Sequence, residues 1–559
     1  MGRIRIEFVP IKPYGLGWLG FDHLQLVFEP GSSSEQVAQD EWLVLEGNPG
    51  RSCSGTILGV PGAGGSRTLA IANLATGAEL AALIGLPHDR GSRVLPVEGD
   101  PREAWERMAQ YARAINDSEF GYRMYGPPGT PFPSVNSSSL IASLLWRIGI
   151  DINHHLPAGI GFSPGTGTLL GTGGNDRMAL PEAGFDTLVG GAGDDDLMGT
   201  NDPARTDKLF GGAGNDVIAW SSGFNIIHGG QPGLTEEDDG FDTVDYRGAG
   251  IVTVYRSRRL LPGVLPDLVV TFTGSGSGGG IDWLYSIEAL LLDPVSDRLV
   301  MGSGAGGKLR ALAVDMRGAG QFAGGGWVDL STADNGVFVK AVGADEIEVS
   351  TGETGCGGWT IAGVERLTGT GLADTIQMSR SMRVVEGGAG DDIIDARLVA
   401  PGLASGRYGY DAEIDGGDGD DTLIGSRGRT FARGGPGRNT FVLALPGELG
   451  EGDQTELIIA DAKPQDRLLV QATAKDDRCA GVEARTLFNL TGRGALRGPG
   501  GAVRGNGIAF ERDGADLVIR INRHGAELAR GRTVFGRWRE AIVRVLNFQR
   551  GDLGIDTAV

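Results

Sequence analysis

The sequence contains little cysteine, little histidine and no long hydrophobic run. Its three cysteines, Cys53, Cys356 and Cys479, lie far apart in a chain of 559 residues, which argues against a disulfide framework or a paired-cysteine zinc site. An HExxH motif is also absent from the sequence, so we expect no metalloprotease of the zincin type. Because no run of about 18 apolar residues occurs, we expect no helix that spans a membrane.

A signal peptide and a basic stripe are not apparent either. The first residues, Met1 to Phe8, show neither the apolar segment nor the cleavage site of a signal peptide, so export would need another route. Acidic residues number 71 and basic residues 50, which gives a net charge of −21. We therefore expect no nucleic-acid partner. The acidic excess favours either solubility or the binding of hard cations such as calcium.

Glycine, by contrast, is abundant. The chain has 97 glycines, and 40% of its residues are hydrophobic, enough for sizeable cores. The glycines do not follow the every-third-residue rule of collagen. Many of them belong to a nonapeptide that begins GGxGxD. Four copies are clear: Gly190–Met198, Gly211–Ala219, Gly387–Asp395 and Gly416–Ile424.

The copies keep a common register. A spacing of nine residues, or a multiple of nine, separates the sixth-position aspartates in the pairs Asp186 and Asp195, Asp207 and Asp216, and Asp374 and Asp392. Glycine permits a tight turn whose carbonyls point inward, and the aspartate adds a carboxylate. Calcium favours about six to eight such oxygens, so we expect stacked turns nine residues apart to share an ion. The apolar residues that follow, such as Leu197 and Ile218, predict short strands facing a narrow core.

The nonapeptides resemble those of the RTX (hemolysin-type calcium-binding) proteins over about residues 165–445. The resemblance implies a parallel β-roll that folds in calcium, and a secreted, extracellular protein exported by a type I secretion apparatus. It assigns as calcium ligands Asp195, Asp216, Asp392 and Asp421, with the carbonyls of Gly191, Gly193, Gly212, Gly214, Gly388, Gly390, Gly417 and Gly419. Weaker copies add Asp176, Asp186, Asp207 and Asp374. Arg383, Thr430 and Asn439 stand at carboxylate positions, so we expect sites to be lost there.

The fold class that follows is mainly β, a β-roll or β-solenoid preceded by a small α+β domain. The predicted division is an α+β domain at 1–160, calcium-repeat arrays at 165–242 and 374–445, a degenerate β-rich spacer at 243–373, and a C-terminal β cap at 446–559. A terminal unit has to cover the exposed edge of a solenoid. By resemblance, the last segment also carries the secretion signal.

The N-terminal region contains one segment with a possible catalytic pattern. Residues 135–149 predict a helix capped by Asn136 or a neighbouring serine. The segment resembles the nucleophile helix of papain-like amidases and acyltransferases, in a circularly permuted form, with Ser137 in place of the cysteine. A partner would be His23, which would have to activate the serine as a general base. The alternatives are a purely structural helix cap and a catalytically inactive relative.

Three functions remain compatible with the sequence. The first is a secreted calcium-binding protein whose roll folds on extracellular calcium. The second adds a hydrolase or acyltransferase that uses the pair Ser137 and His23. The third is an extracellular adhesin or surface-layer component with a cell-surface or glycan partner. The repeats do not choose among them, because a fold does not fix a function, and whether the chain is an enzyme stays open.

Overall fold

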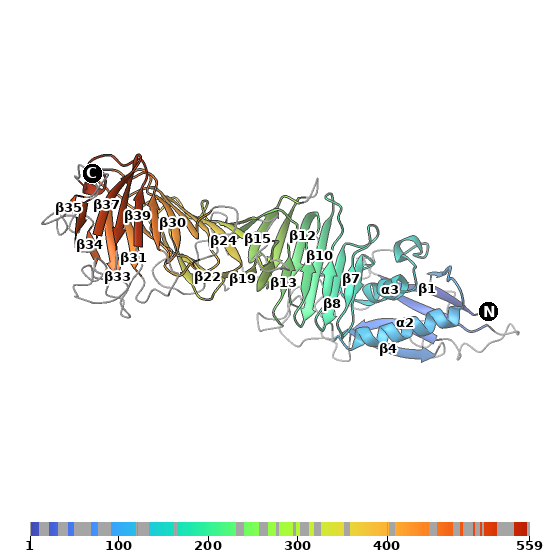
Figure 1. The fold of residues 1–559 in the computed structure, drawn as a ribbon. Helices are drawn as coiled ribbons and strands as arrows, with labels where there is room; N and C mark the ends of the chain where they lie inside the picture. Colours follow the sequence, from blue (N-terminus) through green and yellow to red (C-terminus); the bar gives the residue numbers. More distant parts are fainter. Residues whose placement is uncertain are drawn as a thin grey trace. The chain divides into compact units, whose positions relative to one another are not determined.

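The structure is a computed structural model of the full chain (Figure 1). It describes residues 2–10, 22–31, 43–49, 69–76, 91–118, 120, 133–160, 163, 165–230, 240–256, 266–274, 279–293, 298–301, 312–317, 326–351, 358–399, 401, 409–445, 455–472, 481–483, 496–497, 503–505, 508–521 and 541–555. Cys53, Cys356 and Cys479 lie outside these ranges. Among the described residues, no helix has both the length and the hydrophobicity that crossing a bilayer requires.

The chain divides into two compact units. One comprises Met1–Ala249 with Ser257–Ala289, and the other comprises Gly250–Arg256 with Leu290–Val559. Each unit contains its own roll of parallel strands, which confirms the mainly β fold class. The five predicted domains stay a prediction, since two units by themselves fix none of their boundaries.

The N-terminal part of the first unit is an antiparallel sheet with two helices, drawn in blue to teal in Figure 1. The sheet has the order β4-β3-β2-β1-β5. Its strands are β1 (Arg3–Pro10), β2 (Asp22–Glu29), β3 (Leu43–Pro49), β4 (Leu69–Thr76) and β5 (Gly91–Val94). The helices are α2 (Pro101–Asn116) and α3 (Ser137–Trp146). Alternate residues of β1, such as Ile4 and Ile6, are fully buried, as expected for a strand with one face on a core.

The first roll follows directly and consists of two parallel sheets. One sheet contains β6 (Thr168–Leu170), β8 (Thr187–Ala192), β10 (Thr206–Ala213), β12 (Gly223–His228) and β16 (Gly280–Tyr285). The other contains β7 (Arg177–Ala179), β9 (Asp196–Met198), β11 (Val217–Ala219) and β13 (Thr243–Asp245). In-register pairs such as Leu197 with Ile218 fill the narrow core, where both side chains are at most 2% exposed.

The helices cover the first coil of this roll. The amide of Leu170 in β6 donates to Ser143 Oγ of α3 at 2.9 Å, and Tyr111 of α2 donates to the Leu170 carbonyl at 2.8 Å. The amide of Gly173 donates to the carbonyl of Ala114 at 3.0 Å. An end strand without a neighbour would leave these backbone groups unpaired. The helices therefore act as the N-terminal cap of the roll.

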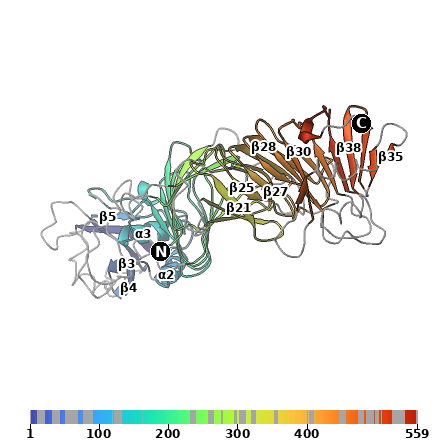
Figure 2. The same cartoon turned by 90° about the vertical axis from the view of Figure 1, so that its left-hand side faces the viewer.

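The second unit contains a longer roll. One sheet contains β14 (Ile251–Arg256), β18 (Arg298–Met301), β20 (Gly326–Asp329), β24 (Val364–Thr368), β26 (Val384–Ala389), β28 (Ala412–Asp418), β30 (Arg429–Arg433) and β32 (Glu456–Ile459). The other contains β19 (Leu312–Asp315), β23 (Trp359–Ala362), β22 (Glu346–Thr351), β21 (Val337–Ala341), β25 (Thr375–Gln377), β27 (Ile393–Asp395), β29 (Thr422–Ile424), β31 (Thr440–Leu445) and β33 (Arg467–Ala472). In this second sheet, β22 is antiparallel to both of its neighbours, β21 and β23. Figure 2 shows β21, β25 and β27 side by side.

Antiparallel strands end the second roll. β32 pairs with β39 (Ala541–Val545). In the same sheet, β39 pairs antiparallel with β38 (Asp516–Ile521), and β38 pairs antiparallel with β37 (Ile508–Asp513). β32 therefore has a paired neighbour at an edge that would otherwise be exposed.

Candidate calcium-binding site

The two edges of each roll differ in how the chain turns. At one edge the chain leaves a strand of the first sheet, such as β8, and enters a strand of the other, such as β9. We call this the aspartate edge, because the sixth-position residues Asp195, Asp216, Asp392 and Asp421 end its turns. At the opposite edge, the return edge, the chain comes back to the first sheet at Asp186, Asp207, Asn225, Arg383, Asp411 and Thr430.

This alternation corrects the expected spacing of the stacked turns. Turns nine residues apart, such as those of Asp186 and Asp195, lie at opposite edges because each nonapeptide crosses from one sheet to the other. The neighbour of Asp195 in its stack is Asp216, 21 residues later. An ion shared between neighbouring turns would therefore join residues a full coil apart.

Along the aspartate edge of the first roll, the sixth-position side chains form a hydrogen-bonded ladder. Each carboxylate accepts the backbone N–H of the sixth residue in the preceding turn. Asp176 N–H donates to Asp195 Oδ1 at 2.7 Å, and Asp195 N–H donates to Asp216 Oδ1 at 2.8 Å. The ladder continues to Asp242 at 2.9 Å and to Glu288 at 3.0 Å. Each turn is thus aligned with the next by a carboxylate.

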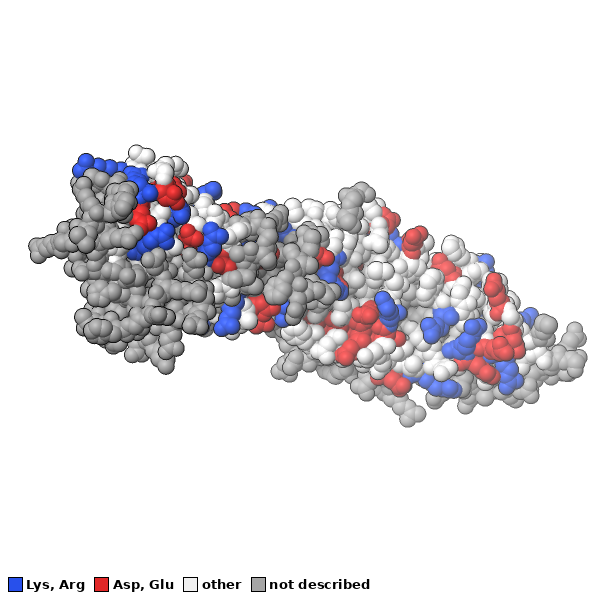
Figure 3. Space-filling view, viewed as in Figure 1, with Lys and Arg blue, Asp and Glu red and all other residues white. Residues whose placement is uncertain are grey.

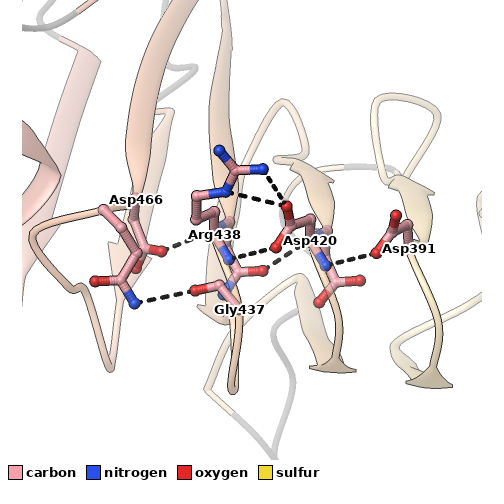
Figure 4. A network of polar contacts seen from close by, with 8 residues as sticks. Asp391, Asp420, Gly437, Arg438 and Asp466 are labelled. Carbon is pink, nitrogen blue, oxygen red and sulfur yellow. Dashed lines mark hydrogen bonds and ion pairs between the residues drawn. The ribbon is translucent and has the colours of Figure 1, made fainter.

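The second roll repeats this ladder. Asp374 N–H donates to Asp392 Oδ1 at 2.8 Å, and Asp392 N–H donates to Asp421 Oδ1 at 2.9 Å. Asn439 and Asp466 extend the ladder at 3.0 and 2.8 Å. A second, outer ladder runs beside it through the fifth-position residues: Asp420 N–H donates to Asp391 at 2.9 Å, and Arg438 N–H donates to Asp420 at 2.8 Å (Figure 4).

Four ladder carboxylates keep one oxygen without a partner. The Oδ2 atoms of Asp195, Asp216, Asp392 and Asp421 are buried and have no hydrogen-bond partner in the described part of the chain. These side chains are at most 2% exposed. Burial raises the pKa of Asp195 and Asp392 to about 7 and that of Asp216 and Asp421 to about 6, against the opposing effect of the N–H that each accepts. A buried carboxylate oxygen without a partner is costly, so these four positions call for a cation.

The glycines of the same four turns make room for one. All eight predicted glycines have positive φ, from 94° at Gly417 to 150° at Gly419: Gly191, Gly193, Gly212, Gly214, Gly388, Gly390, Gly417 and Gly419. A β-carbon at Gly417 would meet the carbonyl oxygen of Gly388, the equivalent glycine one turn earlier. A β-carbon at Gly190 would meet Oδ2 of Asp195. Side chains would therefore fill the space in which carbonyl and carboxylate oxygens gather.

We call these four the open turns: 190–195, 211–216, 387–392 and 416–421. Among the described residues, no three His, Cys, Asp or Glu side chains cluster as a metal site. The ligands would thus have to combine one or two aspartates with backbone carbonyls. Such an all-oxygen set suits calcium, which accepts carbonyl oxygens readily.

Three of the weaker predicted ligands lie in turns that threonine closes. Oδ2 of Asp176 accepts the N–H of Thr172 at 2.6 Å and its hydroxyl at 2.8 Å. Asp374 accepts the N–H of Thr370 at 2.6 Å and its hydroxyl at 2.9 Å, and Asp207 has the same two contacts from Thr200. Threonine thus supplies donors where an open turn has a glycine. The sequence carries this signal as GT instead of GG.

The remaining return-edge positions also use donors from the chain. Asp186 is exposed and accepts the Thr187 hydroxyl at 2.7 Å. Deeper in the first roll, Asp282 accepts the amide of Asn225 at 2.8 Å and the hydroxyl of Tyr246 at 2.7 Å. In the second roll, the hydroxyl of Thr430 accepts the N–H of Ser426 at 2.8 Å. Asp207 and Asp411 each keep one buried oxygen without a partner among the described residues.

Several ladder residues escaped the sequence analysis. Asp242, Glu288 and Asp466 occupy sixth positions, yet none follows a GGxG turn. The available signal is weak: each acid stands directly before or one residue before a short apolar strand. Long insertions separate these acids from the preceding turn, so a fixed period does not find them.

A comparison with protein families now identifies these turns. The family model described as "RTX calcium-binding nonapeptide repeat" matches in four copies, at residues 182–202, 204–231, 384–398 and 413–442. The chain carries RTX repeats. Each matched segment contains one open turn, and each roll contains two of the segments. A comparison with curated proteins finds no match.

RTX nonapeptides bind calcium, and the open turns fit that ion. Asp195, Asp216, Asp392 and Asp421 would hold it together with the glycine carbonyls of the same edge. Bound calcium supplies positive charge to the unpartnered Oδ2 atoms. The charges on the surface are balanced differently from those of the open turns. Acidic and basic side chains lie interspersed on the face drawn in Figure 3, and neighbours such as Arg317 and Asp315 form an ion pair at 2.8 Å.

The predicted pair Ser137 and His23 lies in the N-terminal sheet and helices. Ser137 is the first residue of α3 and is 4% exposed. Asn136 caps the helix, since its side chain accepts the N–H groups of Ser138 at 2.8 Å and Ser139 at 3.2 Å. An oxyanion at the helix start would need these same N–H groups. Because Asn136 already accepts them, the contacts favour the interpretation of a structural helix cap. Only the backbone of His23 belongs to the described residues, so the pair stays a prediction.

Proposed function

We propose that this protein is a secreted calcium-binding RTX protein whose two rolls fold when calcium binds outside the cell. One observation supports the proposal above all: four buried carboxylates, one in each matched repeat, each have an oxygen with no hydrogen-bond partner among the residues that the structure describes. A charge in such a place is tolerated only when it is paired or coordinated.

The energetics couple calcium binding to folding. Without calcium, the ladder aspartates either carry uncompensated buried charge or must take up protons. With calcium, the same oxygens gain a counter-charge, and the binding free energy adds to the folding free energy. Calcium is scarce inside cells and abundant outside, so the rolls would stay unfolded until export. This order suits a type I secretion apparatus, which we propose as the export route.

In this proposal the five predicted segments have separate roles. Residues 165–242 and 374–445 bind calcium, 243–373 joins the two arrays, and 446–559 covers the last coil and carries the secretion signal. Residues 1–160 cover the first coil through α2 and α3. A cell-surface or glycan partner would be met by this assembled, calcium-loaded form.

Circular dichroism during a calcium titration tests the proposal. The full chain, stripped of metal, should lose most of its β signal and recover it when calcium is added. Magnesium at the same concentration should restore much less, because it demands a smaller octahedral site and keeps its waters. An unchanged β spectrum in the absence of calcium would refute calcium-coupled folding.

A second function is a hydrolase or acyltransferase in the N-terminal region. Its support is that α3, which begins at Ser137, packs against β2, the strand that contains His23. Ser137→Ala should then abolish hydrolysis of ester and amide substrates while the thermal stability is unchanged. Equal hydrolysis by both proteins, or none by either, would leave Ser137 with its role in the helix start.

A further inference from the structure

The last glycine-rich turn of the second roll, which we call the last turn, differs from the open turns before it. It comprises residues 434–439, with the sequence GGPGRN, so asparagine stands in the sixth position. Its backbone keeps the open-turn form: φ is 69° at Gly435 and 121° at Gly437. The turn thus keeps the positive-φ glycines of an open turn, but an asparagine replaces the carboxylate.

Nitrogen donors from the chain approach the carbonyls of this turn. The Lys463 ammonium and the Asn439 amide both donate to the Gly435 carbonyl, the latter at 3.0 Å. The Gln465 amide donates to the Gly437 carbonyl at 3.2 Å. At the corresponding glycines of the open turns, the described residues provide no side-chain donor to these carbonyls.

The donors come from the next turn along the edge. Residues 461–466, with the sequence DAKPQD, occupy the place of a nonapeptide turn and end in the ladder residue Asp466. Asp461 accepts the N–H groups of Gly434 and Gly435, both at 2.8 Å. The turn 461–466 therefore holds the last turn in two ways: Asp461 accepts its N–H groups, and Lys463 and Gln465 donate to its carbonyls.

The outer ladder places a second positively charged side chain, Arg438, at the turn 434–439. Arg438 stands in the fifth position, and its guanidinium bonds Asp420 at 2.8 and 3.1 Å (Figure 4). This pair joins the last turn to the open turn 416–421. Hydrogen bonds from an ionised donor are roughly twice as strong as neutral ones.

We propose that the Lys463 ammonium takes the place of a calcium ion at the turn 434–439, so that this turn keeps its structure without calcium. The inference rests on the proposed function, because it treats the open turns as calcium sites. In this proposal, the calcium-binding turns of the second roll end at 416–421, and Lys463 occupies the next position. The chain thereby provides one turn whose charge is balanced in every condition.

Hydrogen exchange by mass spectrometry on the full chain tests this inference. In chelator, amides of 434–445 should stay protected while those of 387–395 and 416–424 exchange rapidly. Lys463→Met should speed exchange of 434–445 in chelator by about tenfold or more, because a charge-assisted hydrogen bond is lost. Lys340→Met, which removes an exposed lysine of β21 in the same unit, is the matched control and should change nothing there.

The inference and the proposed function fail in different ways. If calcium leaves the exchange of 387–395 and 416–424 unchanged, the proposed function is wrong. If the wild-type 434–445 exchanges in chelator as fast as those segments, or if Lys463→Met has no effect, the inference is wrong. Should Lys463→Met not fold, the wild-type comparison decides. As a further check, Asn439→Asp with Lys463→Met should bind one more calcium ion than the wild type, and an equal number would contradict the assignment.

Discussion

The open turns and the threonine-closed turns of the aspartate edge have the same fold but treat their carboxylates in opposite ways. In the open turns, glycine occupies the second position, and the carboxylates of Asp195 and Asp392 keep an oxygen without a partner among the described residues. In the closed turns, the N–H and hydroxyl of Thr172 and Thr370 donate to Asp176 and Asp374. The comparison teaches that a repeated aspartate alone does not define a calcium site. At this edge, the residue four positions before the aspartate decides whether the chain itself satisfies the carboxylate.

The largest expected effect comes from removing one open-turn carboxylate. Asp195→Asn keeps the ladder, because the amide oxygen can still accept the Asp176 N–H, but it removes the charge that faces the ion. Calcium affinity of the first roll should fall at least about tenfold, as measured by isothermal titration calorimetry. Asp186→Asn, at the return edge of the same roll, is the control and should change the affinity less than twofold. Equal losses in both variants would remove the distinction between the edges.

The next effect concerns the glycine backbone of an open turn. Gly417→Ala forces an alanine to a φ of 94° and drives its β-carbon into the Gly388 carbonyl. The free energy of unfolding in calcium should fall by about 2–5 kcal/mol, as measured with urea. Gly371→Ala, where a β-carbon meets nothing within 4 Å, should change it by less than about 0.5 kcal/mol. Similar urea midpoints for the two variants would show that close stacking of carbonyls is not required.

Without calcium, the stability of the folded rolls should depend on pH. The folded pKa of Asp195 and Asp392 is about 7, whereas an unfolded aspartate has a pKa of about 3.9. The folded form therefore binds more protons between about pH 4 and pH 7, so stability falls as the pH rises through this window. In metal-free buffer, the chain should retain more of its β circular-dichroism signal at pH 5 than at pH 7.5, and Asp195→Asn with Asp392→Asn should flatten the profile. A β signal that rises with pH would contradict the burial of these groups.

The smallest effect is expected at a closed turn. Thr370→Val removes the hydroxyl that donates to Asp374 and should lower the free energy of unfolding in calcium by about 1 kcal/mol. Thr375→Val, one residue after that aspartate in β25, is the control and should be nearly neutral. Urea unfolding in calcium measures the loss, and calorimetry should give both variants the calcium affinity of the wild type. A lower calcium affinity in Thr370→Val alone would mean that Asp374 is a calcium ligand after all.

The sequence predicted the local features of the site and missed the long-range ones. Each open turn depends on six consecutive residues, so the GGxGxD pattern located Asp195 and Asp421 and the positive-φ glycines before them. The short strands after them were equally local, and Leu197 and Ile218 are buried as expected. Both features follow from backbone geometry within one nonapeptide.

The stacking of the turns could not be predicted from the nine-residue period. Successive nonapeptides cross to opposite edges, and loops of different length separate true neighbours, as between Asp216 and Asp242 or Asp242 and Glu288. The donors at the last turn come from Lys463 and Gln465, in a loop without the repeat motif. Pairings of this kind depend on the tertiary arrangement of coils, which a local pattern does not contain.

The most direct test of the central claim is an anomalous difference map from crystals of the calcium-loaded protein. The account predicts peaks at the aspartate edges, beside Asp195 and Asp216 in the first roll and beside Asp392 and Asp421 in the second. It predicts none at the threonine-closed turn of Asp374 and none at the turn 434–439. Peaks at the return edges, or aspartate edges without any peak, would contradict it.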